Sequence, residues 1–168
     1  MGEKCRDVNL DSSLQALKAI DFELAYLALL TREGIKPLSR WEKPLDEKGI
    51  KLLRRMDLTV KQVRRKVKTG DVVIETIFSR SPIPLELYEK RFADTAVDKS
   101  AGTQRFEGFL FGYPPCCIEQ YIRQPYARNS LTDQQQKILF HWACNNCNVT
   151  PLLLQAYERI YRRLNEIE

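Results

Sequence analysis

The longest pattern of hydrophobic positions in the first half of the chain has the spacing of an amphipathic helix. Leucine and isoleucine recur at intervals of three and four between Leu14 and Leu30, which is the period of one helix face. Ser12 or Ser13 precedes this run as a helix cap, and Gly34 follows it as a stop signal. The pattern therefore predicts one long helix that buries a leucine stripe, after a loose N-terminal segment.

Two shorter patterns follow, one helical and one typical of strands. Inward-facing apolar positions predict a second helix over residues 46–56. Residues 72–78 are dense in β-branched side chains, which favours a strand, and a turn precedes them at residues 69–71. We expect residues 63–68 to pair with this strand as a hairpin, although residues 59–62 also resemble a capping box that would begin a helix.

The hydrophobic positions of the second half predict helices with polar loops between them. Residues 94–104 are polar and predict a loop, and a short helix near Phe106 ends at Gly112. A helix that begins at Thr132 is expected to continue through Trp142. Proline or a capping residue marks the other helix starts, at Pro84, Pro114–Pro115 and Thr150–Pro151.

These elements predict a mainly α protein with a small β-hairpin, an α+β fold. The 168 residues, of which 43% are hydrophobic and 29% charged, suit one globular domain over residues 1–168. We expect a helix-plus-hairpin part over residues 12–98 and a helical part over residues 100–168. The chain contains no apolar stretch of membrane-spanning length, and the polar N-terminus does not resemble a secretion signal, so we expect a cytoplasmic location.

Positive charge is concentrated in one stretch. The net charge is +5, and residues 51–70 contain eight basic residues against one acid. Such a stretch can contact the phosphates of a nucleic acid. The candidate contacts are Arg54, Arg55, Arg64, Arg65, Lys66 and Lys68. A solvated basic face is the simpler interpretation, because no aromatic residues that could stack on bases are interleaved with these positions.

Four of the five cysteines and the only histidine lie in two short stretches. Cys144 and Cys147 form a C-x-x-C, the usual half-site of a zinc or iron–sulfur centre. His141 precedes Cys144 by three residues, so we expect both on one face of the helix end. Cys116 and Cys117 follow a helix-starting Pro-Pro pair, which places them in a first turn where the helix dipole favours thiolates. The sequence therefore predicts that the two stretches share a metal site.

Two ligand sets fit these residues. One of Cys116 and Cys117 would complete a set of three cysteines with His141, and both together would give four cysteines with His141 nearby. Neighbouring helical side chains point roughly 100° apart, so we expect one of the two thiols to remain free for another role. A mixed cysteine–histidine set favours zinc, whereas an iron–sulfur cluster, the alternative cofactor, prefers cysteines alone.

Three functional hypotheses follow from these features. The first is a metal-dependent enzyme or redox protein, with Cys116, Cys117 or Glu119 as catalytic candidates and Glu107 as a further acid or base. The second is a nucleic-acid-binding accessory protein with a structural metal and the basic stretch as its contact face. The third is a metal-free thiol enzyme with Cys116 as nucleophile and His141 as base.

The segment Gly112–Ile118, read together with the later His-x-x-Cys-x-x-Cys, resembles an uncharacterised prokaryotic domain family. That family has a Gly-Tyr-Pro-x-Cys-Cys motif followed by a His/Cys motif, and the resemblance covers residues 106–157. The family usually has a proline where this chain has Ala143, and it spaces the two later cysteines a little more widely. The family has no assigned activity, so the resemblance implies a site at these residues and does not imply a reaction.

Overall fold

The computed structural model describes residues 2–67 and 69–167, with side chains described from Asn9 onward. The first half contains both strands and helices, and the described part of the second half contains helices and loops. The strands are β1 (Ser39–Trp41), β2 (Thr59–Lys66) and β3 (Val72–Ser79). The helices are α1 (Gly2–Ile20), α2 (Phe22–Arg32), α3 (Glu47–Arg55), α4 (Pro82–Phe92), α5 (Ala101–Leu110), α6 (Pro115–Arg123), α7 (Asp133–Lys137) and α8 (Thr150–Glu166). The fold is therefore α+β and mostly helical, as the sequence predicts.

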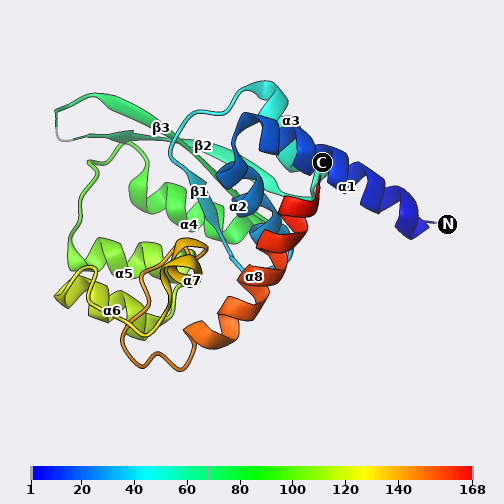
Figure 1. The fold of residues 1–168 in the computed structure, drawn as a ribbon. Coiled ribbons are helices and arrows are strands. Elements are labelled where there is room, and N and C mark those ends of the chain that lie inside the picture. Colours follow the sequence, from blue (N-terminus) through cyan, green and yellow to red (C-terminus); the bar gives the residue numbers. More distant parts are fainter. Residues whose placement is uncertain (1, 68, 168) are drawn as a thin grey trace.

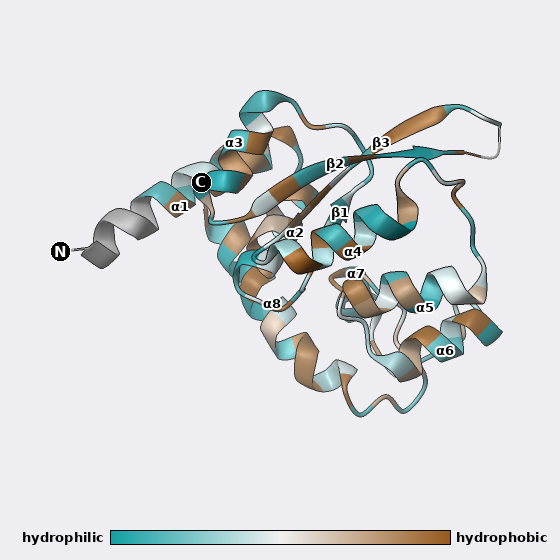
Figure 2. Ribbon diagram, turned by 180° about the vertical axis from the view of Figure 1, so that it is seen from behind, coloured by the Kyte–Doolittle hydropathy of each residue, from teal (hydrophilic) through white to brown (hydrophobic). Residues whose placement is uncertain are grey.

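The three strands form one antiparallel sheet in the order β1-β3-β2. The predicted hairpin is confirmed, because β2 pairs with β3 along its whole length, from Thr59 opposite Ser79 to Lys66 opposite Val72. The alternative helix at residues 59–62 is wrong. Figure 2 shows the contrast within the hairpin, where β3 carries a hydrophobic run and the facing end of β2 is hydrophilic.

Helices cover both faces of the sheet, and the described residues form two hydrophobic cores. Phe78 of β3 packs into the first core with leucines from α1, α2 and α3 and with Tyr157 of α8. Ile77, the preceding residue, packs into the second core with Leu85 of α4 and Leu110 of α5. This opposition follows from the alternation of side chains along a strand. In Figure 1, α8 runs beside α2, while α5 and α6 lie below α4.

The N-terminal helix differs from the prediction at both ends. A helix already begins at Gly2, so Ser12 and Ser13 lie inside it, and their hydroxyls donate to the carbonyl of Asn9. The predicted single helix is broken at Asp21, whose extended backbone and carboxylate cap α2 by accepting from the Glu23 N–H. The hydrophobic period runs through this break, because α1 and α2 both bury leucines in the first core.

Two loops in the second half also differ from the prediction. The polar loop is shorter than residues 94–104, because Ser100 caps α5 through the Thr103 N–H. The capping box at Thr132 is present, but α7 ends at Lys137 and does not continue through Trp142. Residues 138–149 therefore form an irregular segment that leads into α8. Among the described helices, none combines the length and the apolar character needed to cross a membrane.

Candidate metal centre

The first two thiols are positioned by the end of α5 and the start of α6. Gly112 adopts a positive φ of 71°, which favours glycine, and the Tyr113 N–H donates to the Gly108 carbonyl, so α5 ends here as predicted. Pro115 is the first residue of α6, and Cys116 and Cys117 follow in its first turn. The helix dipole favours negative charge at this end of α6, and therefore favours thiolates at these two positions.

The other two thiols come from the irregular segment that precedes α8. Cys144 and Cys147 flank a turn in which Asn146 has a positive φ of 55°, a conformation that asparagine tolerates better than most residues. The prediction that His141 and Cys144 share a helix face is wrong, since both lie outside any helix. In Figure 1, this segment returns from α7 past α6 to the start of α8.

The four sulfur atoms converge on one point. Sγ of Cys117 lies 3.7 Å from that of Cys144 and 3.5 Å from that of Cys147, and the Cys116 and Cys147 sulfurs are 3.6 Å apart. All four lie within 4.8 Å of one another, and this group of four could hold a metal ion. In a tetrahedral site with metal–sulfur bonds of about 2.3 Å, neighbouring sulfurs are about 3.8 Å apart.

Both Cys116 and Cys117 therefore belong to the group, and the expectation that one of them points elsewhere is wrong. Neighbouring positions on a helix diverge, but in the first turn of α6 the group lies at the end of the helix and not beside it. Cys117 is buried and meets Cys144, whereas Cys116 is exposed and approaches Cys147 from the solvent side.

Backbone N–H groups from two segments donate hydrogen bonds to these sulfurs. The Cys144 N–H donates to Sγ of Cys117 over 3.3 Å, and the Thr150 N–H at the start of α8 donates to Sγ of Cys147 over 3.2 Å. Burial alone would raise the pKa of Cys147, but hydrogen bonds from the hydroxyl and N–H of Thr150 and from Val149 lower it to about 6. Two helix N-termini and these donors favour thiolate at the site.

Without a nearby cation, burial disfavours the thiolate form of Cys117 and Cys144. Burial raises the pKa of Cys117 to about 11, and burial together with neighbouring cysteines raises the pKa of Cys144 well above its usual range. A bound cation reverses this preference, because a coordinating thiol is deprotonated by the metal. Cys117 and Cys144 are therefore suited to a bound cation and are poor isolated nucleophiles.

His141 lies beside the thiols and is not among them. Its ring is buried, and Nε2 lies 3.0 Å from the Thr150 hydroxyl, which in turn lies 3.5 Å from Sγ of Cys117. Nδ1 has no hydrogen-bond partner among the described residues. Burial and the positive charge of Lys36 lower the pKa of His141 to about 4. His141 therefore supports the cluster through Thr150, a residue that the sequence indicated only as a helix start.

The two glutamates considered as acids or bases have other partners. Glu119 forms a bidentate pair with Arg105 on the surface, at 2.5 and 2.9 Å, and this pair lowers the pKa of the carboxyl. Glu107 accepts from Arg40 at 2.7 Å and from Arg65 at 3.2 Å in the second core. Among the described contacts, neither carboxylate meets a thiol.

The basic stretch does not form one continuous face. Arg54 and Arg55 lie at the end of α3, and Arg64 and Lys66 lie on the exposed side of β2 toward its far end. Arg65 is 1% exposed and points into the second core, because strand residues alternate between faces. Arg65 is therefore not available to a nucleic acid, and the Lys68 prediction lies outside the described residues.

Comparisons of the chain with protein-family models, with curated proteins and with solved structures find no significant match. The geometry of the cysteine group is therefore the basis of the functional conclusion.

Proposed function

We propose that the chain binds one zinc ion through Cys116, Cys117, Cys144 and Cys147, and that this zinc has a structural role. The observation that carries the proposal is the convergence of four sulfur atoms within 4.8 Å from two segments of the chain. Sulfur separations of 3.5–3.7 Å are close to the edge of a zinc–thiolate tetrahedron, about 3.8 Å.

The same distances favour a single ion over an iron–sulfur cluster. In a cluster the cysteines are divided among two or more iron atoms, which separates the thiolates of different irons beyond the spacing seen here. A shell of four thiolates suits zinc, which takes cysteine ligands in tetrahedral sites. Zinc is therefore proposed on the distances within an all-cysteine set, and not on the mixed cysteine–histidine set expected from the sequence.

A structural role is supported by the closed ligand shell and by its position. Structural zinc sites have four protein ligands, whereas catalytic ones keep a position open for water or substrate. Cys116 and Cys117 are connected to the second core through α5, and Cys144 and Cys147 are connected to the first core through α8. One ion at this point cross-links segments anchored in different cores.

The test is metal analysis of protein purified anaerobically without added metal. We expect about one zinc per chain, colourless protein, and loss of most of the zinc in the Cys117→Ser and Cys147→Ser variants. Cys5→Ser is the matched control and should retain full zinc. His141→Gln should also retain it, because the ring is not a ligand in this arrangement.

Three outcomes oppose the proposal. A brown protein with two or more irons per chain would establish a cluster, and a chain without stoichiometric metal would leave the four thiols as a metal-free group. Loss of zinc in His141→Gln with retention in Cys116→Ser would show that the ligand set contains three cysteines and the histidine.

A further inference from the structure

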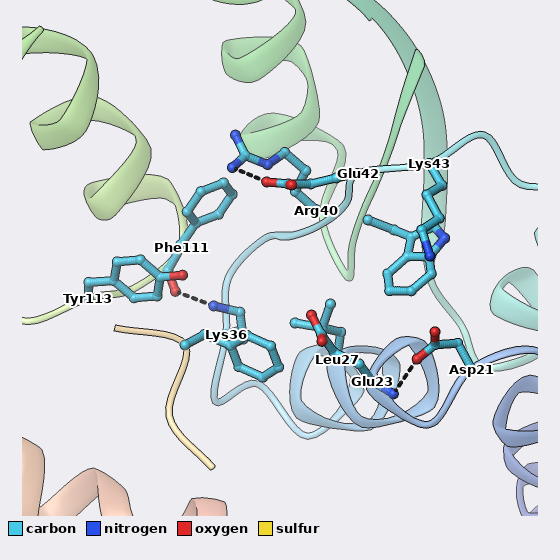
Figure 3. Close-up of a pocket in the computed structure, with 11 residues that line it drawn as sticks. Asp21, Glu23, Leu27, Lys36, Arg40, Glu42, Lys43, Phe111 and Tyr113 are labelled. Carbon is cyan, nitrogen blue, oxygen red and sulfur yellow. Dashed lines mark hydrogen bonds and ion pairs between the residues drawn. The ribbon is translucent and has the colours of Figure 1, made fainter. Parts of the chain in front are cut away.

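A cavity of about 420 Å³ lies between the start of α2, strand β1 and the segment that joins α5 to α6. Figure 3 shows Glu23 and Leu27 of α2 on one side and Phe111 and Tyr113 on the other. Its walls are aromatic and its polar groups are mostly charged. The residues that matter here are Lys36, Arg40, Trp41, Phe111, Tyr113 and Phe140.

Lys36 is the unusual member of this wall. The residue is 2% exposed, and its Nζ donates one hydrogen bond, to the carbonyl of Phe111 at 3.2 Å. Lysine is almost never fully buried without a paired acid. Among the described residues, no carboxylate forms an ion pair with Lys36, and the nearby charge that acts on it is the cation Arg40. The amine therefore has spare hydrogen-bonding capacity beside an open space.

The aromatic rings around Nζ stabilise an ammonium group at this position. Nζ lies 4.6 Å from the centre of the Tyr113 ring, and the Phe140 and Phe111 centres are at 5.3 and 5.5 Å. Such rings attract an ammonium group. They do not outweigh the cost of burial, because burial and Arg40 lower the pKa of Lys36 to about 7. A neutral amine is thus abundant at physiological pH.

Arg40 donates to three side chains, whereas Lys36 donates to one backbone carbonyl. The Arg40 guanidinium donates to Glu107 at 2.7 Å, to Glu42 at 2.9 Å and to Tyr88 at 3.3 Å. Its charge is therefore a fixed feature of the wall. Desolvation and an adjacent cation are the two devices that convert a lysine into a nucleophile, and both act on Lys36.

We propose that Lys36 is a carbonyl-binding amine and that the cavity admits a small aldehyde or ketone with an apolar body. The Nζ lone pair adds to the carbonyl carbon to give a carbinolamine. The carbonyl oxygen then leaves as water with the two amine hydrogens, and a carbon–nitrogen double bond remains. Protonation of this imine restores an N–H that can donate to the Phe111 carbonyl. The step needs neither oxidant nor reductant, and aromatic walls suit an aromatic or branched ligand body.

Benzaldehyde with sodium cyanoborohydride tests the proposal on the full chain at pH 7. The hydride reduces the imine to a stable secondary amine, and peptide mapping locates the added mass. Lys43 is the internal control, because it lies on the Trp41 ring in the same wall but is exposed. We expect Lys36 to be modified at least about tenfold faster, because an ordinary lysine with a pKa near 10.4 is almost wholly protonated at pH 7.

The pH dependence gives a second measurement on the same sample. Because cyanoborohydride reduces only the protonated imine, the labelling of Lys36 is divided at each pH by that of Nα-acetyl-lysine in the same mixture. This ratio should be constant below about pH 6 and should fall between about pH 7 and 9, where Lys36 is already neutral and the neutral fraction of an ordinary lysine still rises. Arg40, Tyr113 and His141 face this amine, and none of them changes charge over that range, since the pKa of Tyr113 is raised and that of His141 is about 4.

Two variants test whether the labelling depends on Lys36 itself and not on a change in the fold. Lys36→Arg should abolish labelling at the site while keeping the cation, and Lys43→Arg should leave the labelling of Lys36 unchanged, with circular dichroism confirming the fold of each. Equal rates at Lys36 and Lys43, or an unmodified Lys36, would overturn the inference. Metal content is measured separately on the same protein, so that a failure of Lys36 labelling and a failure of zinc binding are distinguished.

Discussion

Arg64 and Arg65 are neighbours on β2 with opposite environments. Arg64 points to solvent and pairs loosely with Asp94 at 3.8 Å. Arg65 is buried and contacts Glu75, Glu107 and the Tyr88 hydroxyl. The Tyr88 hydroxyl also donates to Glu75 at 2.5 Å, so the charges of this network are closely compensated.

Replacing each arginine with methionine separates the two environments. Arg65→Met should lower the free energy of unfolding by about 3–5 kcal/mol, because Glu75 and Glu107 would lose a cation in the second core. Arg64→Met, the matched control, should change stability by no more than about 0.5 kcal/mol. Urea unfolding monitored by circular dichroism measures both. Equal effects would mean that the buried network does not hold the hairpin on α4 and α5.

For single residues, the sequence predicted that the cysteines form a metal site, but it did not predict how they are arranged. Four cysteines in two stretches indicated a metal site, and the structure brings those four together. The ligand set could not be predicted, because it depends on how the turn at Asn146 approaches the end of α6. Lys36 had no local signal at all. The rings that enclose it come from positions 111, 113 and 140, far along the chain.

At the scale of elements, α5 and α6 pack closely because Gly108 has no side chain. A Cβ built at this position would lie 2.4 Å from Cδ1 of Ile118 and 2.7 Å from its Cγ1. Such distances are well below van der Waals contact, so a larger residue would push α6 away from α5. The first turn of α6 contains Cys116 and Cys117, and its position therefore depends on a glycine in α5.

Gly108→Ala and Gly102→Ala give a matched pair within α5. We expect Gly108→Ala to destabilise the protein by about 1–3 kcal/mol and to weaken zinc retention against a chelator. Gly102 has open space around it, so Gly102→Ala should stabilise α5 by about 0.5–1 kcal/mol through helix propensity. Thermal unfolding and a chelator titration measure the two effects. Stabilisation by both substitutions would show that Ile118 moves aside freely.

Elements with their own pattern were predictable, and elements made by tertiary contacts were not. The β2–β3 hairpin was predicted from its β-branched run and its turn. Strand β1 has only three residues, and it is a strand because it pairs with Thr76–Phe78. The break at Asp21 was missed because the leucine period continues across it, since α1 and α2 face the same core.

At the scale of the whole molecule, the proposed zinc joins segments that lead to different cores. α8 closes the first core with Leu154, Tyr157, Ile160 and Leu164, and its N-terminus contacts Cys147. α5 closes the second core and leads directly into the first thiol pair. The positions of the sulfurs therefore depend on the packing of both cores.

Tyr113 stands three residues before Cys116 and also forms part of the wall around Lys36. Its ring packs against His141, 5.4 Å between centres, and His141 contacts Thr150 beside the thiols. An ion that immobilises Cys116 and Cys117 therefore also orders the cavity wall. Reciprocity of linked equilibria then requires that a ligand that orders the wall strengthens metal binding by the same factor.

We therefore expect the chain to retain zinc against a chelator more strongly when benzaldehyde occupies Lys36, and this difference should vanish in Lys36→Arg. An unchanged chelator midpoint would mean that the two sites are energetically independent. If the two sites are coupled, the segment from Tyr113 to Cys117 transmits the effect of binding at one site to the other. The amount of available zinc then changes how tightly the chain binds its carbonyl ligand.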